Sequence, residues 1–200
     1  MSSPFLRIEP HSQLRVLRLT SPDGTNLRLT RACVLHLTNA VDELAQHEQP
    51  LVVTGNNKFF SAGADLAEIT ALDGPSALEF SKMGQALMQQ IEEFPAPVYA
   101  AISGYCMGGG LDLALACHRR IASPHAVFGH RGAALGLITG WGGTQRLPRL
   151  IGKGRALAMF VASEKITAEQ ALRMGLVDTI VEDPVAEAVS RIVSRTDRLP

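Results

Sequence analysis

Residues 102–117, ISGYCMGGGLDLALAC, are the stretch that decides how this chain folds. They begin where the apolar run Val98–Ile102 ends, and that run predicts a buried strand. Three glycines, Gly108 to Gly110, precede a run of leucine and alanine that predicts a buried helix. A glycine turn lets a ligand approach the main chain, and the first amides of a helix suit a carboxylate, a phosphate or an oxyanion. The alternative is a packing turn without a ligand, because a glycine cluster alone is a weak signal.

Composition and spacing exclude several classes of function. The chain has 200 residues, 46% of them hydrophobic, and a net charge of zero, which favours one domain and gives no reason to expect nucleic acid as a partner. The glycines follow neither the Walker A nor the G-x-G-x-x-G spacing. The most apolar region is interrupted by glycines and contains Asp112, residues 1–13 lack a signal-peptide run, and the three cysteines lack zinc spacing. We therefore expect a cytoplasmic protein that binds neither membranes nor metal.

Strands and helices are expected to alternate along the chain. The predicted strands cover residues 14–19, 51–55, 98–102, 120–123, 126–128 and 177–181. One predicted helix begins after Thr30, which is expected to cap it. The other predicted helices cover residues 66–72, 76–93, 111–116, 143–150, 154–163, 167–174 and 184–195. This alternation predicts an α/β fold with largely parallel strands, without a sequence repeat or a linker.

Four segments, in order and at matching separations, resemble the enoyl-CoA hydratase/isomerase (crotonase) family. They are FSAGADL at 60–66, GYCMGGGLD at 104–112, FG at 128–129 with GGTQRL at 142–147, and ITAEQA at 166–171 with GLVD at 175–178. The resemblance runs from about residue 14 to 181 and implies a spiral of ββα units, assembled as homotrimers or hexamers. It also implies an acyl-CoA thioester as ligand, with coenzyme A as part of the substrate and no covalently bound cofactor. We expect residues 1–183 to form the crotonase-like core domain and residues 184–200 a C-terminal helix and tail.

By motif matching, the resemblance assigns an oxyanion hole to the backbone amides of Ala64 and Gly109. Removing a proton beside a thioester carbonyl places negative charge on its oxygen. Each preorganised amide that faces such an oxygen lowers the barrier by about 3 kcal/mol in other enzymes. The alternative for residues 60–66 is a tight turn that needs small side chains.

The sequence departs from the family at both acid–base positions. The hydratases of the family use two glutamates across the substrate double bond. Here the first position is Asp112, one methylene shorter, and the second is Gly132, which has no side chain. We therefore expect that ordinary hydration by two carboxylates is disfavoured. The alternative for Asp112 is a polar residue in the first turn of a helix, where it favours the dipole.

His130 and Arg131 are the nearest substitutes for the missing glutamate. A histidine suits proton transfer near neutral pH, and an arginine suits a substrate carboxylate or an exogenous anion. Family members similar to naphthoate synthase can have glycine at the second position and use bound bicarbonate as a base, and the GWG at 140–142 resembles that branch. The aspartate that this branch carries shortly before its GWG is absent, and Thr139 stands in that region. The alternative for His130 is a surface histidine at a strand end.

The remaining candidates are weaker. For Tyr105, packing in the core is the stronger interpretation, and Trp141 is expected in packing or in a pocket wall. Cys106 is expected to be structural, and Lys58 and residues 26–28 are candidate contacts for the remote part of coenzyme A. The candidate catalytic residues are Ala64, Gly109, Asp112 and His130, and the candidate substrate contacts are Ala62, Asp65, Leu66, Tyr105, Gly108, Arg131, Gly132, Thr139 and Trp141.

The C-terminal region is the second departure. Family members usually continue as helices that cover the thioester and contact a neighbouring subunit, whereas this sequence stops one helix after Val181. We expect a shortened helical region whose cover is dispensed with or supplied by a partner. Three hypotheses follow: an acyl-CoA enzyme that stabilises an enolate with a non-standard acid–base set, a catalytically inactive CoA-binding or assembly module, and an ordinary enoyl-CoA hydratase.

Overall fold

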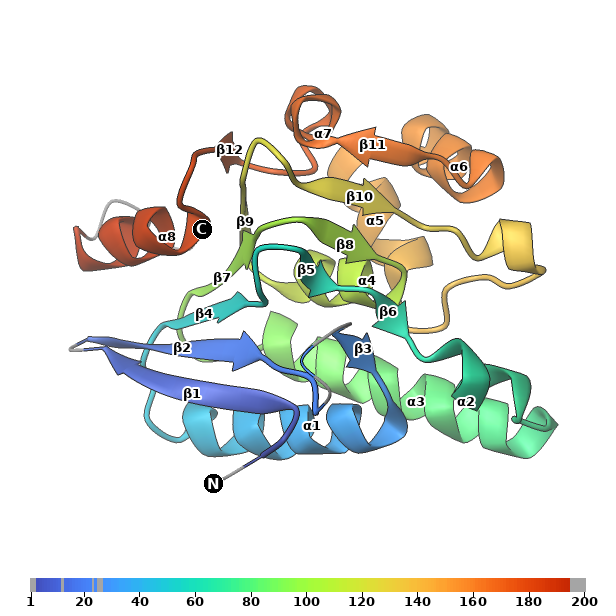
Figure 1. Cartoon of the computed structure of the whole chain (residues 1–200), viewed down its shortest axis with the longest axis horizontal. Helices are drawn as coiled ribbons and strands as arrows, with labels where there is room; N and C mark the ends of the chain where they lie inside the picture. The colour runs from blue at the N-terminus through green and yellow to red at the C-terminus, as the bar shows by residue number, and fades with distance from the viewer. Residues whose placement is uncertain (1–2, 12, 23, 25–26, 195–200) are drawn as a thin grey trace.

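The computed structural model describes residues 3–11, 13–22, 24 and 27–194. It is a spiral in which most turns contribute one strand to a large sheet, one strand to a smaller sheet and then a helix (Figure 1). The pairs β4 and β5, β7 and β8, and β9 and β10 follow this order. The expected α/β spiral of ββα units is therefore confirmed.

The large sheet has six strands and is parallel except for its first pair. In spatial order it contains β1 (Leu6–His11), β2 (Leu14–Leu19), β4 (Leu51–Thr54), β7 (Val98–Ile102), β9 (Arg119–Ala122) and β12 (Thr179–Ile180).

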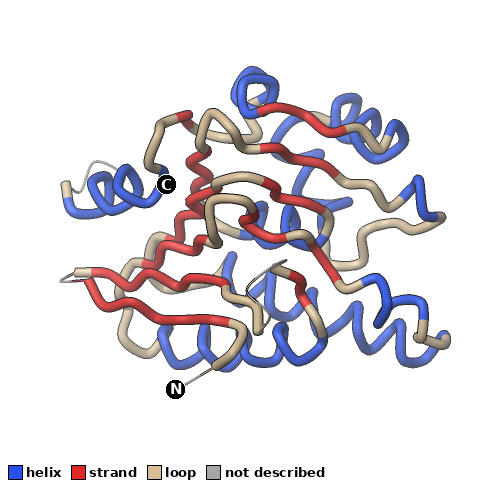
Figure 2. The backbone as a smooth tube through the Cα atoms, in the orientation of Figure 1, coloured by secondary structure: helices blue, strands red, loops and turns tan. Residues whose placement is uncertain are grey.

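Two smaller sheets lie beside it, as the tube view shows (Figure 2). The four-stranded sheet contains β11 (Lys165–Thr167), β10 (Val127–Gly129), β8 (Tyr105–Met107) and β5 (Phe59–Ser61), and the two-stranded sheet contains β3 (Arg28–Leu29) and β6 (Gly63–Ala64).

Helices follow the strands along the described chain. They are α1 (Arg31–Ala45), α2 (Leu66–Thr70), α3 (Gly74–Glu92), α4 (Gly109–Ala116), the 3-10 turn η1 (Ala133–Leu135), α5 (Gly143–Ile151), α6 (Lys153–Ala162), α7 (Ala168–Met174) and α8 (Pro184–Val193). Thr30 and Thr167 cap α1 and α7 as expected, each accepting a backbone N–H of the first turn. None of these helices has the length and apolar character that crossing a membrane requires.

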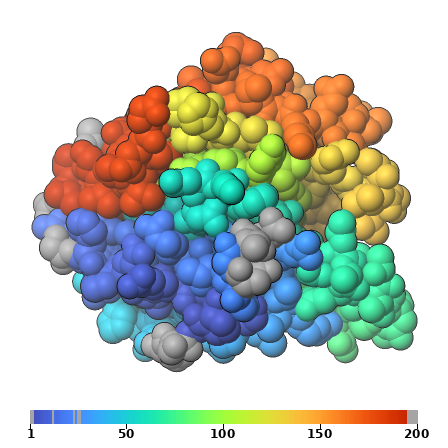
Figure 3. All heavy atoms as spheres, in the orientation of Figure 1, coloured from blue at the N-terminus to red at the C-terminus, as the bar shows by residue number. Residues whose placement is uncertain are grey.

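The large sheet is buried on both faces, and alternate side chains of its strands point to opposite sides. Val98 and Ile102 of β7 point into the main core with α3 and α4, whereas Tyr99 and Ala101 point into a second core against α8. Figure 3 shows α8, in red, beside β1 and β2 in blue. The pattern explains why β4 and β7 read as continuous apolar runs in the sequence.

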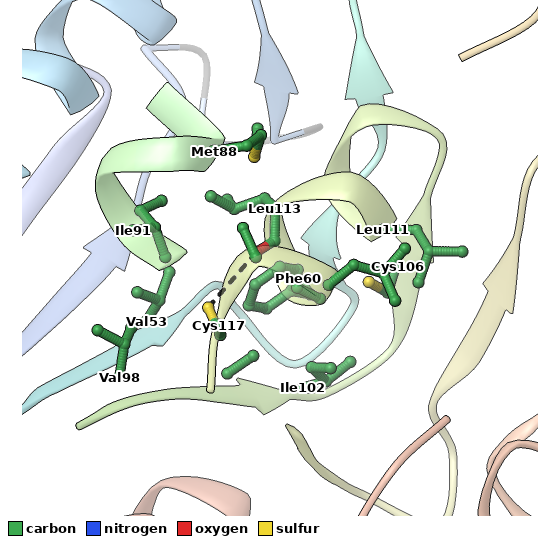
Figure 4. Close-up of a cluster of buried hydrophobic side chains, with 14 of the residues drawn as sticks. Val53, Phe60, Met88, Ile91, Val98, Ile102, Cys106, Leu111, Leu113 and Cys117 are labelled. Carbon is green, nitrogen blue, oxygen red and sulfur yellow. Dashed lines mark hydrogen bonds between the residues drawn. The ribbon is translucent and has the colours of Figure 1, made fainter. Parts of the chain in front are cut away.

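The main core surrounds α4, which is buried along its whole length. Leu111 and Leu113 of α4 lie near Phe60 of β5, Cys106 of β8 and Ile102 of β7 (Figure 4). Packing on all sides fixes the helix, and it therefore fixes the position of its first residue.

The structure corrects the sequence prediction at several elements. The glycines do not follow the strand β7 directly, because Ser103 and Gly104 turn the chain into β8 before α4 begins. The helix predicted over residues 76–93 begins two residues earlier, at Gly74, because the Asp73 side chain accepts the N–H of Ser76 and caps α3. The strands β1, β3, β5, β6, β8 and β11 were not predicted.

Candidate active site

A cavity of about 700 Å³ opens between the two smaller sheets, α2, α3 and the loop of residues 131–140. Every candidate site residue from the sequence lines it except Asp65. Asp65 instead caps α2 and forms an ion pair of 2.9 Å with Arg28. The side-chain hydrogen bond from Arg28 and two backbone N–H groups hold the pKa of Asp65 below its usual value. Asp65, which directly follows Ala64, therefore positions the start of α2.

The segment of Ala64 and the start of α4 are in direct contact. A Cβ added to Gly63 would lie 3.2 Å from the backbone nitrogen of Gly109, and one added to Gly109 would lie 3.4 Å from that of Ala64. Gly108 turns the chain with a φ of 51°, in the left-handed region that favours glycine, and its N–H donates to Gly129 O at 2.9 Å. Two backbone nitrogens, one of them at a helix start, thus lie beside the same cavity.

Hydrogen bonds hold the strand that leads into Ala64. Ala62 N–H donates to Leu27 O at 2.8 Å, and the Ser61 hydroxyl donates to the same carbonyl at 2.9 Å. Gly63 N–H in turn donates to Ser61 Oγ at 3.1 Å. Residues 61–64 therefore form the tight small-residue turn that the sequence offered as an alternative, and this turn is part of the cavity wall.

Asp112 and His130 form a buried pair at the cavity. Asp112 Oδ1 lies 3.1 Å from His130 Nε2, and the two residues are 2% and 4% exposed. The Thr139 hydroxyl donates to the other carboxylate oxygen of Asp112. Both carboxylate oxygens of Asp112 are therefore engaged, one by the Thr139 hydroxyl and the other by the His130 ring. The Phe160 ring packs edge-on against His130, with centroids 5.3 Å apart.

Gly132 lies where a larger side chain does not fit. A Cβ added there would meet Leu137 O at 2.7 Å, which is closer than real Cβ atoms approach. The carbonyl belongs to the same loop, which closes through Leu137 N–H donating to Gly132 O at 2.9 Å. The loop is therefore built around a glycine at residue 132, where the family resemblance predicts the second acid–base position.

Two alternatives from the sequence are wrong. His130 is not a surface histidine, because the pair with Asp112 buries it. Tyr105 is not a core residue, because it is 38% exposed and its ring lies at the cavity beside Phe59 and Lys165. Trp141 is both packed and part of the cavity wall, as expected.

The other candidates lie apart from the cavity or in the core. Lys58 is exposed and does not line the cavity, and Asn26 lies outside the described residues. Arg28 pairs with Asp65, as described above. Cys106 is buried, and burial raises the pKa of its thiol well above the usual value, so it is not a ready nucleophile.

The sequence analysis missed Lys165 and most of the apolar wall. Lys165 lies at the cavity with Nζ 5.0 Å from the centroid of the Tyr105 ring, and no motif marks it. The apolar wall comes from α2, α3 and the loop after η1, including Ile69, Phe80 and Ile138. Periodic apolar residues of α2 and α3 were the available signal, but periodicity does not say which of them face a cavity.

Comparison with known proteins gives the family to which the chain belongs. The chain is 38% identical over 194 residues to crotonyl-CoA hydratase of Syntrophomonas wolfei, covering 94% of this chain and 74% of that one. It is 46% identical over 143 residues to a protein of Bacillus subtilis named probable enoyl-CoA hydratase, covering 70% of this chain and 55% of that relative. The solved structure of Pseudomonas aeruginosa DspI superposes with a TM-score of 0.92 at 34% identity, covering 100% of this chain and 78% of that one. The enoyl-CoA hydratase/isomerase family matches residues 9–200, so the chain belongs to this family.

Proposed function

We propose that this chain is an acyl-CoA enzyme that stabilises a thioester enolate, with Asp112 and His130 as its acid–base pair. The observation that carries the proposal is the buried hydrogen bond between these two side chains, at a cavity that also receives the start of α4. Membership of the family supports a CoA thioester as substrate. It also supports assembly as a homotrimer or hexamer, in which the exposed Leu157 and Val161, one turn apart on α6, would be covered.

In the proposed mechanism, the thioester oxygen rests against the amides of Ala64 and Gly109. His130 Nδ1 accepts the proton from the carbon beside the carbonyl, and the electrons of that bond move to the oxygen. Asp112 stabilises the imidazolium that forms, and Thr139 orients the carboxylate. Returning the proton to the same or another carbon completes the exchange or the isomerisation.

Hydrogen exchange tests this mechanism. Butyryl-CoA in deuterated water is expected to exchange the hydrogens beside its carbonyl with the wild-type protein, followed by mass spectrometry. We expect Asp112→Asn and His130→Gln each to slow exchange on the order of a hundredfold or more, because each removes half of the proton-transfer pair.

The matched control is His125→Gln, which changes an exposed histidine that does not line the cavity. It should leave the exchange rate unchanged. Exchange at the wild-type rate in His130→Gln would overturn the role of His130. A wild-type protein that binds butyryl-CoA without exchange, and that also fails to hydrate crotonyl-CoA, would support the inactive module instead.

The names of the two curated relatives favour a second candidate, hydration of an enoyl-CoA. In that reaction the Asp112–His130 pair would activate the water. Crotonyl-CoA hydration followed by ultraviolet absorbance separates the candidates. Hydration that Asp112→Asn abolishes, without exchange on butyryl-CoA, would favour the hydratase over the enolate-stabilising enzyme.

A further inference from the structure

The only tryptophan of the chain is wedged between two glycines on different helices. Trp141 is 4% exposed. A Cβ added to Gly84 of α3 would lie 2.2 Å from its indole, and one added to Gly109 of α4 would lie 2.5 Å from it. The indole therefore fills the space between α3 and the first residue of α4, and no side chain fits on either side of it.

One stretch of α3 holds the tryptophan in this place. The indole Nε1 donates to Phe80 O at 3.3 Å, and the two rings pack edge to face with centroids 5.3 Å apart. Ser81 Oγ and Gln85 Nε2 donate to Gly140 O, at 2.8 and 2.7 Å. Hydrogen bonds thus fix both the Trp141 indole and the carbonyl of Gly140, the residue before it, to residues 80–85 of α3.

We propose that Trp141 is a positioning residue that sets the place of the Gly109 amide, and that Gly84 is the notch in α3 that admits its indole. The inference rests on the proposed function, in which that amide faces the enolate oxygen. A glycine inside a helix lowers helix stability relative to alanine. Here the indole occupies the space that an alanine methyl would need. A methyl at position 84 pushes the indole toward Gly109 and displaces the amide.

A double-mutant cycle tests the wedge. The variants are Gly84→Ala, Trp141→Leu and both together, with Trp141→Phe made in case the leucine variant does not fold. Gly154→Ala is the matched control, because it lies in α6 with nothing within 4 Å of an added Cβ. Urea unfolding measures stability, and tryptophan fluorescence of Gly84→Ala measures displacement of the indole directly, since no other tryptophan emits.

The functional readout is the enolate of bound acetoacetyl-CoA, measured at saturation by its near-ultraviolet absorbance. We expect Gly84→Ala to lower the enolate-to-ketone ratio on the order of tenfold to a hundredfold while binding changes little, because the amide is misplaced rather than removed. In the Trp141→Leu background the same alanine should cause no further loss and should not lower stability. Gly154→Ala should leave the ratio unchanged.

The outcomes separate the inference from the proposed function. A wild-type enolate signal that Gly84→Ala leaves intact overturns the inference alone. Equal losses from Gly84→Ala in both backgrounds also overturn it, since the alanine would then act without the indole. A wild-type protein that binds acetoacetyl-CoA without any enolate signal overturns the proposed function, and the inference with it.

Discussion

At the scale of single residues, Gly132 lies in the wall of the cavity. Its position leaves no room for a Cβ, because Leu137 O lies 2.7 Å from where that atom would be. We expect Gly132→Ala to lower the free energy of unfolding by about 1–3 kcal/mol through overpacking. We also expect Gly132→Glu to give no gain in crotonyl-CoA hydration, because the loop cannot present the carboxylate. Urea unfolding and a hydration assay measure the two effects.

The control for this pair is Gly154→Ala, where an added methyl meets nothing within 4 Å. A Gly132→Glu variant that unfolds at the same urea concentration as the wild type and hydrates crotonyl-CoA faster would show that the loop can open. The two-carboxylate mechanism would then need only the missing side chain.

The sequence predicted which segments line the cavity better than it predicted the burial and hydrogen bonding of individual side chains. Motif matching gave residues from segments 60–66 and 104–112 that line one cavity. The burial of His130 could not be predicted, since it depends on Asp112, 18 residues earlier, and on Phe160, 30 residues later. Asp65 was assigned to substrate, but its carboxylate accepts hydrogen bonds from the first turn of α2 and from Arg28.

At the scale of elements, His118 joins α3 to the central strand β7. Its Nδ1 accepts the N–H of Val98 at 2.8 Å, and its Nε2 lies 3.1 Å from Glu92 O at the end of α3. Burial lowers the pKa of His118, and the bond to Glu92 opposes this only in part. The neutral ring is therefore the form that the fold selects.

This lowered pKa predicts a stability that depends on pH. Between the folded pKa of His118 and its unfolded value of about 6.5, the unfolded chain binds more protons, so stability rises with pH. The contribution is complete above about pH 6.5 and is lost as the pH falls through the folded value. Urea unfolding at pH values from about 5 to about 8, on either side of the unfolded pKa, should show less of this loss in His118→Asn, whose amide oxygen can still accept from Val98. Equal pH dependence in the two proteins would refute the assignment.

The elements that sequence analysis missed are mostly those too short to show a period. The strands β5, β8 and β10 each contain three residues, and only β10 was anticipated, as residues 126–128. Together with β11 they form the second sheet, whose pairing comes from segments far apart in the chain. The ββα repeat was therefore invisible in the sequence apart from the family resemblance, although the long strands and most helices could be placed within a few residues.

At the scale of the whole molecule, the cavity and the second core lie on different sides of the large sheet. The cavity is lined by the smaller sheets, α2, α3 and the loop of residues 131–140. The second core lies between α8 and the face of the large sheet that carries Tyr99. We propose residue 183 as the boundary between the family core and a helix that packs on it. The sheet face needs that helix, because Leu14, Val16 and Tyr99 are buried beneath it.

A carboxylate introduced beneath α8 should therefore lower the stability of the fold without changing the active-site cavity. Ala188 is 0% exposed in the second core. We expect Ala188→Asp to lower the free energy of unfolding by about 3 kcal/mol, because the charge is buried among apolar side chains unless the helix detaches. Ala186→Asp is the matched control, since Ala186 is exposed on the same helix. Urea unfolding compares the stability of the two variants. Without urea, at a temperature where both variants are folded, each should exchange the hydrogens of butyryl-CoA at the wild-type rate. Equal stability of the two variants would mean that α8 is not needed to cover the sheet, and loss of exchange only in Ala188→Asp would mean that the two sides of the sheet are coupled.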